Sequence, residues 1–206
     1  MGRERMIAPV VVKVGGSLLD WPDLSGRLSA YLESRQGDRI VLIVGGGRFA
    51  DALRDLDRTH GLGEARSHAL ALRVLDSTAH VLAAIVPGLS VVETLDNLGG
   101  SWAVCRAAIL APRRFLDEDD RSSDPLPHAW ATTTDAIAAR VAVRLGAREL
   151  ILLKSTPIPL GLDLESASRI GLIDPETPRV AAGLPAVLAL NLREPAAIPV
   201  PLLSRT

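Results

Sequence analysis

Hydrophobic residues in the first half of the chain form short continuous runs that alternate with longer amphipathic stretches. Two of these runs, Pro9–Val14 and Arg39–Val44, have the length and the β-branched content of buried strands. The stretches Leu24–Ser34, Phe49–Leu56 and Glu64–Ile85 instead place apolar residues at helical spacing. The last of them is rich in Ala and Leu, so we expect it to be buried. On the helix 49–56, the expected apolar face consists of Phe49, Ala52, Leu53 and Leu56.

The second half continues the alternation. A short strand is expected at Ala107–Leu110, a helix at Thr133–Leu145 and a strand at Glu149–Leu153, which runs into Lys154. The polar segment Leu116–His128 carries two prolines and a run of acidic residues, so we expect a solvated loop. Two more strands are expected at Ala186–Leu190 and Ile198–Leu203. Strands that alternate with helices predict an α/β fold, in which a mostly parallel sheet is covered on both faces.

Composition narrows the classes of protein. The chain has 206 residues and a formal net charge of −1, so no basic excess points to nucleic acid or an anionic membrane as the main partner. No run of 18 apolar residues occurs, and the four histidines lack metal-ligand spacing. The single cysteine, Cys105, excludes an intrachain disulfide and a Cys-rich zinc site. We expect a cytoplasmic protein that folds as one domain over residues 1–206, with no metal site of its own.

Three of the expected strands end in small residues or lysine. Their ends read KVGGS, VGGG and LLKST, and parallel strands bring such ends to one edge of the sheet, where ligands bind. Glycine amides and helix N-termini at such an edge favour the binding of an anion. The alternative is that both glycine segments are tight strand-to-helix turns that bind no ligand. Lys13 and Lys154 are the only lysines among 23 basic residues. Arginine bias alone can explain that scarcity, but both lysines fall at strand ends, where a compact ammonium suits a transferring phosphate.

Two other segments carry candidate site residues. Asp135 follows three threonines and lies in the first turn of an expected helix, where it either only satisfies the helix dipole or orients the two lysines. His128 and Trp130, in the segment PHAW, are candidates for a substrate pocket, and a core position is the alternative for Trp130.

Taken together, VVKVGGSLL, IVGGG and TTDAIAARVAVRLGARELILLKS resemble the amino acid kinase superfamily over most of residues 9–156. That resemblance implies a three-layer α-β-α sandwich, with an acceptor-binding half over about 1–112 and a short nucleotide-binding half over about 113–206. It implies ATP and Mg²⁺ held mainly by phosphates, a small phosphate or carboxylate acceptor, and a homo-oligomer or a larger enzyme assembly. The implied catalytic residues are Lys13, Asp135 and Lys154. The implied nucleotide-phosphate residues are Gly15, Gly16, Ser17, Ser155 and Thr156, and the implied acceptor residues are Gly45, Gly46, Gly47, Arg48, His128, Trp130 and Thr134.

A narrower resemblance concerns PHAWATTTDAIAARVA, ILLKS and HGLGEARSHALALRVLD, which are similar to a branch of small kinases in methanofuran-type cofactor synthesis. It implies conversion of (aminomethyl)furanmethyl phosphate, a phosphomonoester, to the diphosphate. An acetylglutamate-like kinase, another phosphomonoester kinase and a non-catalytic binding or assembly protein remain alternatives. The superfamily usually has a further lysine late in the chain, and none follows Lys154. Arg169, Arg179 or Lys154 itself is the candidate for that role.

Overall fold

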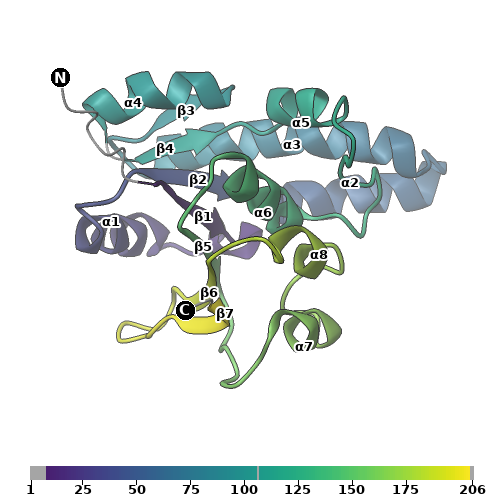
Figure 1. Ribbon diagram of the computed structural model, residues 1–206. Coiled ribbons are helices and arrows are strands. Elements are labelled where there is room, and N and C mark those ends of the chain that lie inside the picture. Colours follow the sequence, from purple (N-terminus) through teal and green to yellow (C-terminus); the bar gives the residue numbers. More distant parts are fainter. Residues whose placement is uncertain (1–7, 106, 205–206) are drawn as a thin grey trace.

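The computed structural model describes residues 8–105 and 107–204, and its centre is one seven-stranded sheet in the order β3-β4-β2-β1-β5-β6-β7 (Figure 1). Neighbouring strands pair in parallel except β7, which is antiparallel to β6. The expected strands are all present, and β3 is one that the sequence analysis missed. The bounds are β1 Val10–Val14, β2 Ile40–Val44, β3 Ser90–Val92, β4 Ala107–Leu110, β5 Glu149–Lys154, β6 Ala186–Asn191 and β7 Val200–Ser204.

Helices cover both faces of the sheet, which confirms the three-layer α/β fold (Figure 1). One hydrophobic cluster joins α1 and the later turns of α3 to one face, and the other joins α5, α6, α7 and α8 to the opposite face. The bounds are α1 Leu24–Ser34, α2 Gly47–His60, α3 Glu64–Ile85, α4 Leu98–Val104, α5 Arg113–Asp119, α6 Thr134–Arg144, α7 Leu164–Arg169 and α8 Thr177–Ala181, with short 3₁₀ turns at Gly16–Leu18 and Leu95–Asn97.

The central strand β1 explains why a lysine can lie inside this sheet. All five of its residues are buried, as expected for a parallel strand with helices on both sides. Side chains alternate between the faces, so Val10 and Val12 pack toward α1 whereas Val11 packs toward α6. Lys13 shares the face of Val11. Its ammonium therefore points to the α6 side at the carboxyl end of the strand.

The expected helix is present as α2, and most of its apolar face is exposed. Leu53 is buried, but Phe49 and Leu56 are about half exposed and Ala52 is exposed. The reason is that α2 packs against α3 and the turn after β1 rather than flat on the sheet. The same arrangement leaves α3 buried along one side only, whereas the sequence analysis expected the whole helix to be buried.

The segment expected as a loop from residue 116 begins as a helix. α5 extends to Asp119 and buries Phe115 and Leu116. Asp119 was expected in a solvated acidic run, yet it is 1% exposed. It accepts a hydrogen bond from Arg144 of α6 at 3.5 Å and forms an ion pair with Arg140 of the same helix, also at 3.5 Å. Two arginines from a distant helix therefore make this carboxylate part of the interior.

Candidate active site

Three charged side chains from three elements meet at the carboxyl edge of the sheet. Lys13 on β1 and Lys154 on β5 approach the carboxylate of Asp135, in the first turn of α6, from two sides. The Lys13 Nζ lies 2.9 Å from Asp135 Oδ1, and the Lys154 Nζ lies 2.8 Å from Asp135 Oδ2. All three side chains are about nine-tenths buried or more. The sheet register explains the meeting, because Lys13 is level with Leu152 and Lys154 follows two residues later on the same face.

The electrostatics of this triad favour a bound anion. Burial disfavours the charged form of Asp135, but Lys13 and Lys154 outweigh that cost and hold the pKa of Asp135 below its usual value. Burial and the like charge of Lys13 lower the pKa of Lys154 from 10.5 to about 8, against the opposing effect of Asp135. Two cations thus share one carboxylate in a poorly solvated place. An incoming anion would relieve their repulsion.

The two glycine turns beside the triad are packed against each other. A Cβ on Gly16 would lie 2.2 Å from the Gly47 amide nitrogen, and one on Gly45 would lie 2.5 Å from the Gly16 nitrogen. Gly47 also has a positive φ of 51°. Glycine is therefore required at these positions by contact between the turns. The Gly15 amide donates to the Leu153 carbonyl at 2.9 Å, so it is engaged within the sheet edge.

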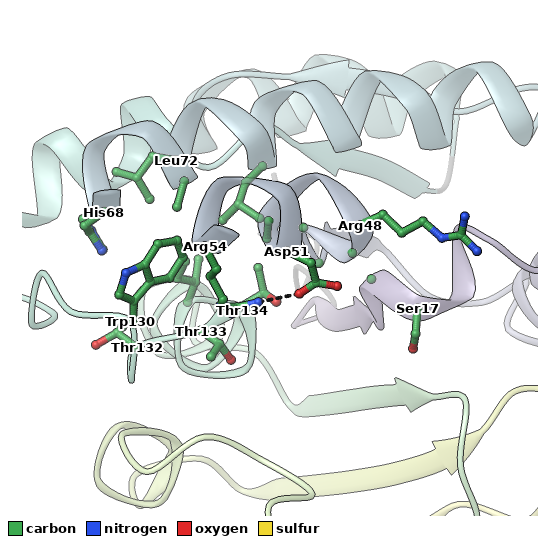
Figure 2. Close-up of a pocket in the computed structure, with 18 of the residues that line it drawn as sticks. Ser17, Arg48, Asp51, Arg54, His68, Leu72, Trp130, Thr132, Thr133 and Thr134 are labelled. Atoms are coloured by element: carbon green, nitrogen blue, oxygen red, sulfur yellow. Dashed lines mark hydrogen bonds and ion pairs between the residues drawn. The ribbon is translucent and has the colours of Figure 1, made fainter. Parts of the chain in front are cut away.

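A cavity of about 340 Å³ opens next to these turns (Figure 2). It lies beside the N-terminus of α2, where the first backbone N–H groups of a helix lack intrahelical partners and attract anions. Of the predicted site residues, the structure brings Lys13, Gly16, Ser17, Gly45, Gly46, Gly47, Arg48, Trp130 and Thr134 into its wall. Gly15, His128, Asp135, Lys154, Ser155 and Thr156 are not part of that wall.

The wall of the cavity away from the triad is both charged and aromatic. Arg54 donates a hydrogen bond to Asp51 at 2.8 Å (Figure 2). The Cζ atom of its guanidinium lies 5.0 Å from the centroid of the Trp130 ring. The Trp130 Nε1 donates to Asp57 at 2.9 Å, which fixes the ring. Arg48 instead extends away from these side chains and pairs with Asp20 while largely exposed. Arg54, rather than Arg48, is the arginine held against the aromatic wall.

His68 takes the place in the cavity wall that the sequence analysis expected for His128. The two rings stack with centroids 4.7 Å apart, and the His128 Nε2 lies 2.7 Å from Asp120 Oδ1. Burial, and then the neighbouring His128, lowers the pKa of His68, and Asp120 opposes this shift. His128 therefore contacts the cavity-lining His68 but does not line the cavity itself.

The residues expected around nucleotide phosphates divide into two groups. The Ser17 and Ser155 hydroxyls lie 2.8 Å apart and join the turns after β1 and β5. Thr156 is exposed. Ser17 also lines the cavity, so the serine pair marks the boundary between the cavity and the edge above β5.

Asp174 is a buried carboxylate that the sequence analysis did not single out. It accepts from Thr133 and Ala136 at the start of α6, and from Thr177 at the start of α8. The pattern Asp-Pro-Glu-Thr is a recognisable local helix cap. Its bonds to α6, about forty residues earlier, have no local signature.

Among the described residues, no group of three His, Cys, Asp or Glu side chains is placed to hold a metal ion. No helix within 8–105 or 107–204 is long and apolar enough to cross a membrane.

Residues 8–158 match the sequence profile described as the Amino acid kinase family. The chain belongs to the amino acid kinase family. The match begins just before β1 and ends just after β5, so it includes the whole Lys13–Asp135–Lys154 triad and both glycine turns of this family member.

A named relative and several solved structures are similar to this amino acid kinase family member. The [5-(aminomethyl)furan-3-yl]methyl phosphate kinase of Methanocaldococcus jannaschii is 33% identical over 143 residues, which are 69% of this chain and 63% of that protein. The UMP kinase of Bacillus anthracis superposes with a TM-score of 0.65 at 13% identity, covering 92% of this chain and 89% of its own. The uridylate kinase of Archaeoglobus fulgidus gives 0.62 at 17% identity, covering 95% and 91%. These structures share the fold.

Proposed function

We propose that the protein transfers the terminal phosphoryl group of ATP to a small anionic metabolite. The observation that carries this proposal is the arrangement of two buried ammonium groups around one carboxylate, beside a cavity and two glycine turns. Phosphoryl transfer requires positioning and neutralisation of charge more than covalent help. Membership of the amino acid kinase family supports the same reaction class.

In this proposal each member of the triad has a distinct role. Lys13 lines the cavity, so its ammonium is placed to neutralise oxygens of the group in transfer. Asp135 is no base, because both of its oxygens are engaged by lysines. It holds the two ammonium groups apart and in place. The acceptor oxygen attacks the terminal phosphorus, the bond from that phosphorus to the bridging oxygen breaks, and ADP departs with the released negative charge.

Lys154 is the candidate for the late cation that the chain otherwise lacks. It faces the same carboxylate as Lys13 and lies on β5, in the half proposed to bind the nucleotide. Arg179 is less suited, because its guanidinium is already engaged by Asp124 at 2.9 Å and by Glu176 at 3.1 Å. Mg²⁺ would add charge neutralisation when bound to the nucleotide phosphates, which supply most of its ligands. The residues present fit the phosphate oxygens of the nucleotide, since the available donors are ammonium groups and serine hydroxyls.

The acceptor proposed first is (aminomethyl)furanmethyl phosphate, which would become a diphosphate. The 33% identical relative is the main support. The cavity also suits a molecule with unlike ends, since Lys13 and the start of α2 attract an anion while Asp51 and Asp57 lie near Trp130. A carboxylate acceptor of the acetylglutamate type and other phosphomonoesters are the next candidates.

A non-catalytic binding protein on the same fold is the second candidate function. The observation in its favour is that the family match ends at residue 158, and that the two helices of the described part beyond it, α7 and α8, are short. This candidate predicts binding of a phosphorylated ligand without production of ADP.

Calorimetric titration with Mg-ATP, followed by an assay of ADP production with each acceptor, separates the two. Lys13→Ala leaves Asp135 paired with Lys154 at 2.8 Å, so the fold should persist while transfer is lost. Arg58→Ala is the matched control, because it also removes one cation, from the exposed side of α2 where Arg58 pairs with Asp55. The proposal predicts ADP formation that Lys13→Ala abolishes and Arg58→Ala preserves. Turnover that survives Lys13→Ala would remove the triad from the reaction, and binding of a phosphorylated ligand without ADP production would favour the second candidate.

A further inference from the structure

Asp174 forms a hydrogen-bond centre that joins two helices next to the triad. Its Oδ2 accepts from the Thr133 amide at 3.0 Å, from the Thr133 hydroxyl at 2.7 Å and from the Ala136 amide at 3.0 Å. Its Oδ1 accepts from the Glu176 amide at 3.0 Å, and from the Thr177 amide and hydroxyl at 2.9 Å each. The side chain is buried, with 6% of the residue exposed. One carboxylate therefore satisfies the starts of both α6 and α8.

The bonds to α6 surround the residue that pairs with both lysines. Thr133 and Ala136 lie on either side of Asp135 in the chain, and both are fixed to Asp174 Oδ2. The Asp135 backbone is bonded only weakly in this turn, to the Thr133 hydroxyl at 3.4 Å. Without Asp174, three donors at the start of α6 would lose their acceptor, and the ion pairs of Asp135 with the two lysines would have to hold this turn without it.

Asp174 also acts on Lys154 through its charge. The groups that face Lys154 are Lys13 from β1, Asp135 from α6 and Asp174 from the segment before α8. Lys13 disfavours the ammonium form of Lys154, whereas both carboxylates favour it. Asp135 pairs directly with both lysines, and Asp174 adds a weaker, more distant attraction for Lys154.

We propose that Asp174 is a positioning residue for phosphoryl transfer, which sets the place of Asp135 between the two lysines through its hydrogen bonds to Thr133 and Ala136. The expected effect of Asp174 on turnover rests on the proposed function, whereas its expected effect on the titration of Lys154 does not. Asp174 lies beyond residue 158, where the match to the family ends, so this role would belong to a part of the chain that the family match does not cover.

The alternative is that Asp174 only caps helices, and Asp163 offers the matched control. Asp163 caps α7 through the Ser166 amide at 2.7 Å, and it is exposed. Asp174→Asn keeps the shape of the side chain, removes its charge and turns an NH₂ group toward N–H donors. Asp163→Asn makes the same chemical change at a cap that is not bonded to α6.

The chain allows a direct measurement, because Lys13 and Lys154 are its only lysines. Protein grown with lysine labelled at ¹³Cε gives two side-chain signals, and Lys13→Arg identifies the one from Lys154. In Asp174→Asn we expect the titration midpoint of Lys154 to fall by about one pH unit, and in Asp163→Asn we expect no change. This measurement requires no substrate, so it stands even if the protein proves not to be a kinase.

Steady-state kinetics supply the second readout. We expect Asp174→Asn to lower kcat at least tenfold, to change both KM values less than threefold, and to move the alkaline limb of the pH profile to lower pH. An unchanged Lys154 midpoint together with a kcat equal to that of Asp163→Asn would overturn the proposal. If Asp174→Asn fails to fold, Thr177→Val decides, because it removes one donor to Asp174 from a fully buried site and keeps the charge. We then expect kcat to fall about threefold or more with the Lys154 midpoint unchanged, and an unaltered kcat would refute the positioning role.

Discussion

Replacement of Gly16 by alanine tests whether the two glycine turns must touch. An added Cβ would lie 2.2 Å from the Gly47 nitrogen, 2.7 Å from the Gly47 Cα and 3.0 Å from the Gly45 carbonyl carbon. All three atoms are backbone of the second turn, so no side chain can rotate away. The turns would have to separate by about an ångström, the difference between these distances and an ordinary carbon contact of roughly 3.5 Å.

The expected cost follows from the energetics of overpacked interiors. Forcing an extra methyl group into a closely packed site costs about 1–3 kcal/mol. For a chain of this size, each kcal/mol lowers Tm by about 2–4 °C, so Gly16→Ala should melt about 2–12 °C below the wild type. Because the displaced turn carries the N-terminus of α2 and borders Lys13, the affinity for Mg-ATP or the acceptor should fall as well.

Gly26→Ala is the matched control for this measurement. Gly26 lies inside α1, is exposed, and has nothing within 4 Å of an added Cβ. Alanine is favoured over glycine inside a helix by about 0.8–1 kcal/mol, so this variant should melt higher than the wild type. Differential scanning calorimetry of the three proteins gives the comparison. If Gly16→Ala melts within about 1 °C of the wild type, contact between the turns is not what requires glycine, and the reasoning fails.

Three further results are expected elsewhere in the chain. Asp119→Ala should lower the free energy of unfolding by about 1–3 kcal/mol in urea titrations, since it removes one of the two carboxylates that pair with Arg140, which is mostly buried. Trp130→Phe should raise the KM for the acceptor and leave the calorimetric affinity for Mg-ATP unchanged, because the ring lines only the cavity. Acidification should destabilise the protein: the pKa of His68 is lowered by burial and by His128, so below pH 6.5 the unfolded chain binds more protons than the folded one. Tm should therefore fall between pH 7 and pH 5, and fall less in His68→Gln; equal falls would contradict the assignment.

The parts of the site that follow from general rules could be predicted from the sequence. Continuous β-branched runs predict buried parallel strands, and the carboxyl ends of such strands share one edge. Lys13 and Lys154 each lie at the end of such a run, and Asp135 lies in the first turn of the expected helix 133–145. The structure brings these three together within 2.9 Å. Strand position and residue type were enough, because the backbone register fixes where these side chains lie.

The parts that depend on packing between distant segments could not be predicted in this way. His68 lies in an Ala- and Leu-rich helix and His128 beside a proline, and neither local pattern indicates which of the two histidines faces the cavity. In the sequence, Asp119 is one of several acidic residues in a row, and its burial depends on ion pairs with two arginines of α6 that the local sequence does not indicate. The capping pattern of Asp174 indicates its bonds to α8, but its bonds to Thr133 come from tertiary structure.

The geometry of the triad explains why lysine, and not arginine, is present at positions 13 and 154. Asp135 presents one oxygen to each lysine, at 2.9 Å for Lys13 and 2.8 Å for Lys154. A guanidinium prefers to bind both oxygens of a carboxylate through a planar fork, so an arginine at either position would compete for the oxygen that serves the other cation. An ammonium needs only one acceptor and keeps its other two N–H groups for a ligand. In a chain whose other basic residues are all arginine, this division of a single carboxylate gives a physical reason for lysine at these two positions.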